Sequence, residues 1–128
     1  MTEITVNLDE IEIKTAKALV NHGAKKWIAD EVAKAVRVAE AEGNKICGLY
    51  YLESYCNQLK SGRVDGKVDP EVKKVSGSSV YVDAKLGFAQ PAFSRGLTLA
   101  VELAKNNGIS LFSIGHSHTS TSMGYFTS

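Results

Sequence analysis

The stretch GHSHTSTSMGYF, residues 115–126, gathers two of the three histidines of the chain and a run of hydroxyl side chains. His116 and His118 are two residues apart after an apolar run, and side chains at that spacing point the same way on a strand. Some metal hydrolases hold their metal with this spacing, but a further ligand is required. His22 lies far upstream, and the aspartates form no matching pair. The sequence therefore assigns no metal site, and a metal-dependent hydrolase using His116 and His118 is the weakest alternative.

Cys47 is the second residue type that could do chemistry. A nucleophilic thiol needs a nearby base and a lowered pKa. Its neighbours Ile46, Gly48 and Leu49 are apolar, a setting that favours an inert core thiol. The chain also has no GxGxxG motif and no P-loop, so we expect no nucleotide to bind in the manner of the dinucleotide folds.

The charge balance excludes several classes of partner. Fifteen basic and fourteen acidic side chains leave a formal charge of +1, which indicates neither nucleic acid nor an anionic membrane as partner. The N-terminal residues lack the pattern of a signal peptide, and no apolar stretch is long enough to span a bilayer. We therefore predict a cytoplasmic protein with reduced cysteines.

Three helices are predicted in the first half, positioned by apolar residues that recur every three or four positions. The first follows an N-cap at Asn7 or Asp9 and ends at Gly23, and the second begins near Lys26. A third helix over residues 46–60 would place Cys47 and Cys56 on opposite sides. We assign residues 1–66 to this helical N-terminal unit.

Residues 67–128 are predicted to begin a mixed sheet domain. Two short strands surround the turn at Gly77-Ser78, a hairpin signal. A crossover helix runs from about Pro91 to Lys105, with a predicted buried face of Phe93, Leu97, Ala100, Val101 and Ala104, and a buried strand follows over 109–114. Residues 124–126 begin another helix. The fold class is thus α+β, and we expect an incomplete domain, because three strands under one helix bury little surface.

Four stretches carry a resemblance to a known family: VAKAVRVAEAEG (32–43), ICGLYYLESYCNQLKSGRVDG (46–66), VYVDAKLGFAQPA (80–92) and HSHTSTSMGY (116–125). Together they resemble the N-terminal part of the type 2 malate/L-lactate dehydrogenase family, which includes ureidoglycolate, sulfolactate and diketogulonate dehydrogenases. The resemblance implies a non-Rossmann fold, NAD or NADP as cofactor, a small 2-hydroxy or 2-oxo acid as substrate, and a homodimer. Family members are more than twice as long as this chain.

The resemblance also implies roles for particular positions. In the family, the third helix opens with Ser-His-Gly, whose histidine donates a proton, and an arginine four residues later holds the substrate carboxylate. A later Asn-Ser-x-His motif supplies another histidine. The corresponding residues make Cys47, Thr119 and His118 the catalytic positions, Tyr51 and His116 the substrate-binding ones, and Ser117 and Thr121 the cofactor-binding ones.

The departures from the family motifs weaken the expected catalysis. A thiol at position 47 is a poorer proton donor near pH 7 than an imidazolium, and the phenol of Tyr51 cannot grip a carboxylate as an arginine does. We therefore expect weak or no turnover from this chain. The alternative is a non-catalytic dimerising or ligand-binding module.

Overall fold

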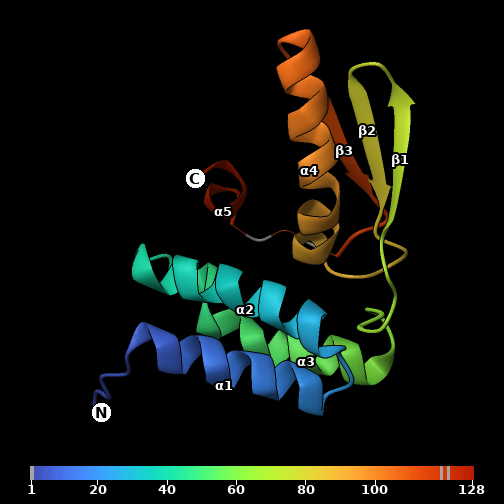
Figure 1. Cartoon of the computed structure of the whole chain (residues 1–128). Helices are drawn as coiled ribbons and strands as arrows, with labels where there is room; N and C mark the ends of the chain where they lie inside the picture. The colour runs from blue at the N-terminus through green and yellow to red at the C-terminus, as the bar shows by residue number, and fades with distance from the viewer. Residues whose placement is uncertain (1, 119, 121) are drawn as a thin grey trace.

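Three helices form the lower layer of the molecule in Figure 1, a computed structural model that describes residues 2–118, 120 and 122–128. These are α1 (Leu8–Asn21), α2 (Lys26–Ala41) and α3 (Leu52–Ser61). The predicted cap of the first helix is confirmed, because the Asn7 side chain accepts a hydrogen bond from the Glu10 N–H at 2.7 Å. Such a cap satisfies one of the backbone donors that a helix start leaves free.

The prediction of one helix over residues 46–60 is wrong. The segment holds two short 3₁₀ turns, η1 (Lys45–Cys47) and η2 (Leu49–Tyr51), before α3 begins. Gly48 lies between them with φ −93° and ψ −131°, outside the helical region. The Leu49 N–H donates to the Glu40 carboxylate on α2 at 2.8 Å instead of to a helical carbonyl. The argument that separated Cys47 from Cys56 falls with the single helix, and both thiols are free.

The sheet confirms the α+β class. Its strands β1 (Glu71–Ser76), β2 (Ser79–Asp83) and β3 (Leu111–Gly115) lie in the order β1-β2-β3. The first two form the predicted antiparallel hairpin, and β3 pairs with β2 in parallel after the crossover helix α4 (Ala89–Asn107). A last short helix, α5 (Gly124–Thr127), begins where predicted. None of the described helices is long and apolar enough to cross a membrane.

The predicted buried faces of α4 and β3 need correction. Leu97 and Val101 are 40% and 42% exposed, whereas Ala100 of the same predicted face is buried and Phe93 stacks on Phe112 of β3. Ala92, Gly96 and Leu103 also face the sheet. A side chain at Gly96 would meet Val82 and the Phe112 ring at 2.5–2.6 Å, so the helix packs too closely for large residues there. The strand begins at Leu111, which is 65% exposed, and Ile109 lies outside it. A glycine adds nothing to a hydrophobic stripe, so the prediction missed the close contact at Gly96.

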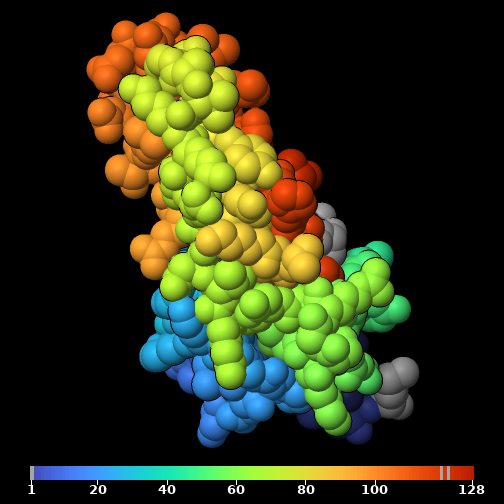
Figure 2. All heavy atoms as spheres, turned by 90° about the vertical axis from the view of Figure 1, so that its right-hand side faces the viewer, coloured from blue at the N-terminus to red at the C-terminus, as the bar shows by residue number. Residues whose placement is uncertain are grey.

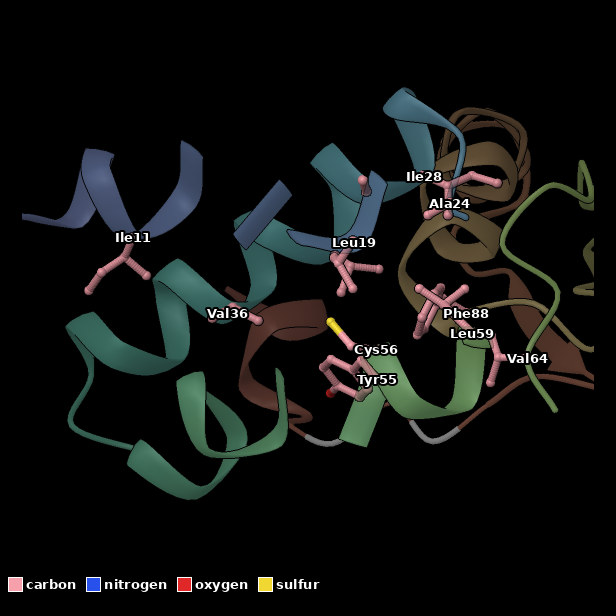
Figure 3. Close-up of a cluster of buried hydrophobic side chains, with 12 residues drawn as sticks. Ile11, Leu19, Ala24, Ile28, Val36, Tyr55, Cys56, Leu59, Val64 and Phe88 are labelled. Carbon is pink, nitrogen blue, oxygen red and sulfur yellow. The ribbon is translucent and has the colours of Figure 1, made fainter. Parts of the chain in front are cut away.

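Two groups of buried side chains make up the core. The first lies among the three helices and takes in Phe88, from the loop before α4, beside Leu59 and Val64 (Figure 3). The second lies between the sheet and α4, where Val80 and Val82 of β2 are fully buried. Figure 2 shows the hairpin and part of β3 at the surface. The division into two domains at residue 66 stays a prediction. Phe88, from the second of these parts, packs into the core of the helical part.

Candidate functional site

The loops that follow β2 and β3 run side by side at the carboxyl end of the sheet. The Leu86 N–H donates to the His116 carbonyl at 2.7 Å, and the His118 N–H donates to the Gly87 carbonyl at 2.8 Å. Lys85, Leu86 and His116 have φ values of +51°, +66° and +51°. Side chains other than glycine are strained in this left-handed region, and such strain concentrates at functional sites. The backbone that carries the two histidines is therefore held in a specific, strained form.

Asp83 connects the two loops. Its Oδ1 accepts the Lys85 N–H at 2.8 Å and lies 3.1 Å from Nδ1 of His116. The pKa of Asp83 is lowered, first by the Lys85 N–H and then, against the opposing effect of burial, by His116. The His116 side chain is 66% exposed. Asp83 therefore orients an imidazole that otherwise faces solvent.

His118 occupies a different environment. Its ring lies edge-on to Tyr55 and Phe88, with centroid distances of 5.7 and 5.8 Å. Its Nδ1 is buried and has no hydrogen-bond partner in the described part of the chain. Burial lowers the pKa of His118 below its usual value of 6.5, and the charge of Arg63 lowers it further. His118 is therefore neutral at pH 7.

A polar pocket of about 430 Å³ lies beside His118. Its walls are formed by Gln58, Arg63, Val64, Leu86, Ser117 and His118. The residues come from α3, from the turn after it, and from the two loops at the end of the sheet. A cation, an imidazole, a hydroxyl and an amide thus converge on one hollow, a set of groups suited to a small anion.

A second, more apolar pocket of about 390 Å³ adjoins the first. It is lined by Ala89, Phe93, Phe112, Ile114, Ser117, Ser120, Met123 and Phe126. Phe93 stacks on Phe112 at 5.4 Å and meets Phe126 edge-on at 4.9 Å. Ser117 lines both pockets. A polar and an aromatic hollow therefore meet at this serine.

The structure brings some of the predicted site residues together. His118 and Ser117 share the polar pocket, and Tyr51 packs on Tyr55 at 6.1 Å, whose ring in turn contacts His118. Cys47 is half-buried in η1, and no hydrogen bond between described residues joins it to either histidine. Thr119 and Thr121 lie outside the described residues.

Three residues of the site, Arg63, Gln58 and Asp83, were not predicted from the sequence. The first two lie within the stretch 46–66 that carries the family resemblance, but nothing in their spacing indicates that α3 and its end turn meet the β3 loop. Asp83 is separated from His116 by a whole crossover helix. Asp83 and His116 lie at the ends of the adjacent parallel strands β2 and β3. Their contact could be predicted only by first predicting that these two strands pair.

The two histidines do not assemble a metal site. His116 contacts Asp83, whereas His118 packs between two aromatic rings. The described residues contain no group of three or more histidine, cysteine, aspartate or glutamate side chains placed to hold a metal ion. The described residues therefore supply no third ligand for a metal bound by His116 and His118, as the metal-dependent hydrolase alternative requires.

The sequence of the chain matches a known protein family. The profile of the malate/L-lactate dehydrogenase family matches residues 6–128. The chain is 33% identical over 114 residues to the delta(1)-pyrroline-2-carboxylate/delta(1)-piperideine-2-carboxylate reductase of Pseudomonas syringae pv. tomato, covering 89% of this chain and 33% of that one. It is 37% identical over 113 residues to the (2R)-3-sulfolactate dehydrogenase (NADP(+)) of Chromohalobacter salexigens, covering 88% and 34%.

A solved structure agrees with these sequence matches. The crystal structure of delta1-piperideine-2-carboxylate reductase from Pseudomonas syringae superposes with a TM-score of 0.87 at 33% identity, over 91% of this chain and 35% of that one. The chain spans about a third of the length of the curated relatives it matches. Because the family profile covers nearly all of its residues, this chain belongs to the malate/L-lactate dehydrogenase family.

Proposed function

We propose that the chain forms the N-terminal part of an NAD(P)-dependent oxidoreductase of a small 2-hydroxy or 2-oxo acid, with weak or no turnover on its own. The observation that carries this proposal is the family match over residues 6–128. The two relatives described above are, by name, a reductase of cyclic 2-imino carboxylates and a dehydrogenase of sulfolactate. Both substrates carry a carboxylate next to the carbon that exchanges hydride.

The two adjoining pockets support the proposal. Hydride transfer requires the acid and the nicotinamide ring to lie side by side, in near-attack geometry. The polar pocket offers Arg63 and His118 to an acid, and the apolar pocket shares Ser117 with it. One hollow thus suits the substrate and its neighbour suits a flat ring.

The residues of the apolar pocket fit the ring end of a nicotinamide cofactor. Phe93, Ile114 and Phe126 offer apolar walls, and the Ser117 hydroxyl can hydrogen-bond a carboxamide. A bound nicotinamide would supply the hydride. Ser117 is therefore our proposed cofactor contact in the described part of the chain, with Thr121 retained from the resemblance alone.

Proton delivery is the weak step of the proposed reaction. The family position for the proton donor holds Cys47, and that for the carboxylate arginine holds Tyr51. Burial and the charge of Arg63 lower the pKa of His118. Its ring is therefore neutral at pH 7 and is not an imidazolium that could donate a proton to the substrate. Cys47, Thr119 and His118 are the proposed catalytic residues. Tyr51 and His116 keep the substrate-binding roles that the resemblance implies. The set supports slow turnover.

A chimaera tests the proposal. This chain would replace the matching third of the Pseudomonas syringae reductase, and consumption of NADPH would be followed with pyruvate and with delta(1)-piperideine-2-carboxylate. We expect consumption about 10²- to 10⁴-fold slower than that of the intact reductase, the usual contribution of general acid catalysis. A folded chimaera that consumes no NADPH and no NADH with any 2-oxo or 2-imino acid would overturn the enzyme proposal.

A non-catalytic dimerising or ligand-binding module is the second candidate. Leu97 and Val101 on α4 and Leu111 on β3 are exposed apolar residues, and the outer edge of β3 is unpaired among the described strands. Open strand edges favour pairing with another chain. This candidate predicts a homodimer in sedimentation and ligand-dependent melting without consumption of NAD(P)H.

For both candidates we propose a cytoplasmic location, with no nucleic-acid or membrane partner.

A further inference from the structure

Arg63 lines the polar pocket and has no counter-ion among the residues that the structure describes. The chain has three arginines. Arg37 is paired with Asp9 and Glu12 at 2.9 Å each, and the Arg95 guanidinium lies over the Trp27 ring at 4.3 Å. No carboxylate of the described residues lies within ion-pair distance of Arg63, although it lines the pocket and its charge acts on His118. Its charge is therefore available to a ligand.

The backbone holds Arg63 firmly in place. Gly62 ends α3 in the left-handed conformation, with φ +75°, and the Val64 N–H returns to the Gln58 carbonyl at 3.3 Å. The Val64 side chain is only 3% exposed and belongs to the helical core. The backbone of Arg63 is thus fixed between Gly62, which ends α3, and the buried Val64, and its side chain extends to the pocket.

The acid nearest to Arg63 in sequence is occupied elsewhere. Asp65 Oδ1 accepts the N–H groups of Lys67 at 2.8 Å and Val68 at 3.2 Å. The Asp65 N–H donates to the Leu86 carbonyl at 3.0 Å, which fastens this turn to the loop after β2. The carboxylate of Asp65 therefore serves its own turn and not the arginine.

We propose that Arg63 binds the carboxylate of a small organic acid in the polar pocket, with Ser117 and His118 beside the carbon next to that carboxylate. A guanidinium binds a carboxylate through two parallel hydrogen bonds. The Ser117 hydroxyl is a further donor, and Val64 and Leu86 form an apolar wall for a short carbon chain. Arg63 would thereby supply the charged grip that Tyr51 cannot. The choice of ligand rests on the proposed function, but the binding itself requires no turnover.

The test uses the intact chain and the NMR signals of its three histidines. Pyruvate is the probe, and its uncharged methyl ester is the matched ligand control. We expect pyruvate to shift the ring signals of His118, and Arg63→Gln to weaken its binding about tenfold or more, because hydrogen bonds to charged groups are the strong ones. Arg63→Lys keeps the charge but not the planar fork, and should fall between the two.

Lys60→Gln provides the matched protein control. Lys60 is exposed in the last turn of α3 and does not line the pocket, so this variant loses the same charge nearby. Equal weakening by Lys60→Gln and Arg63→Gln would show general attraction of anions and overturn the proposal. Equal binding of pyruvate and its methyl ester, or no shift of His118 at saturation, would overturn it as well.

The outcome is separable from that of the proposed function. Binding of pyruvate through Arg63 in the intact chain, with an inactive chimaera, would keep this inference and reject the enzyme. An active chimaera whose KM for the acid is unchanged by Arg63→Gln would keep the enzyme and reject the inference. Circular dichroism melting checks that each variant is folded, and the exposure of Arg63 leads us to expect little change.

Discussion

The imidazole of His118 meets the ring of Phe88 at an interplanar angle of 81°, with ring centroids 5.8 Å apart. Phe88 is 2% exposed and packs edge-on against Tyr55 at 5.6 Å. The Tyr55 ring also lies edge-on to the His118 ring, with centroids 5.7 Å apart. The aromatic rings of the helical core thus form the wall of the candidate site, so core packing and site geometry change together.

Phe88→Ala tests this coupling. We expect the variant to lose about 3–5 kcal/mol of unfolding free energy, because it leaves a cavity in the core, and the NMR signals of His118 to move. Urea unfolding measures the first effect. Leu97→Ala is the control, because Leu97 is 40% exposed and its loss should change stability far less. Equal losses in the two variants would contradict the assignment of Phe88 to the core.

The lowered pKa of His118 predicts a pH dependence of stability. In the unfolded chain the imidazole takes up a proton as the pH falls through about 6.5, whereas the folded chain resists protonation until a lower pH. The unfolded state then binds more protons, so the stabilisation is complete above the unfolded pKa and declines as the pH falls below it. Arg63 and Tyr55 are the charged and titratable groups that face this ring.

Unfolding midpoints between about pH 5 and pH 8 measure the effect. His118→Gln should flatten the decline below pH 6.5, and Arg63→Gln should reduce it, because part of the pKa shift comes from the arginine. His22→Gln is the control at an exposed position on the end of α1. A decline that persists unchanged in His118→Gln would assign the pH dependence to another group.

Local signals in the sequence predicted what depends on neighbours in the chain. The Asn7 cap, the hairpin around Gly77-Ser78 and the crossover helix all follow from residues within a few positions. The break at Gly48 depends on the carboxylate of Glu40, which lies on α2, eight residues earlier in the chain. No pattern of neighbouring residues predicts that contact. The pocket around Arg63 is likewise made by elements more than fifty positions apart, which only the fold brings together.

Gly48→Ala should destabilise the turn before α3. An added Cβ would overlap the Glu40 carboxylate, so that side chain must move and release the Leu49 N–H. Loss of a hydrogen bond to a charged group corresponds to about 1.5–3 kcal/mol. Hydrogen exchange of the Leu49 amide and urea unfolding report the change. Gly77→Ala, in the hairpin turn with open space around it, is the control, and an equal effect there would contradict this account.

Gly96→Ala should loosen α4 from the sheet. The new methyl group would approach Val82 and the Phe112 ring at 2.5–2.6 Å, and overpacking of this kind lowers stability by about 1–3 kcal/mol. Ser94→Ala lies on the same helix and serves as the control. Phe112 also lines the apolar pocket, so Gly96→Ala should weaken binding of NADPH by the chimaera as well. Unchanged stability would mean that the helix can shift without penalty.

Cys47→His and Tyr51→Arg separate proton delivery from carboxylate binding. Placed in the chimaera, Cys47→His should raise kcat by about 10²- to 10⁴-fold, because an imidazolium is a better general acid near neutral pH than a thiol. Tyr51→Arg alone should change kcat little and lower KM only modestly, because Arg63 already grips the carboxylate in our proposal. The double variant should then approach Cys47→His and not exceed it greatly. If Tyr51→Arg instead restores most of the activity, the family arginine is the missing group, and Arg63 does not replace it.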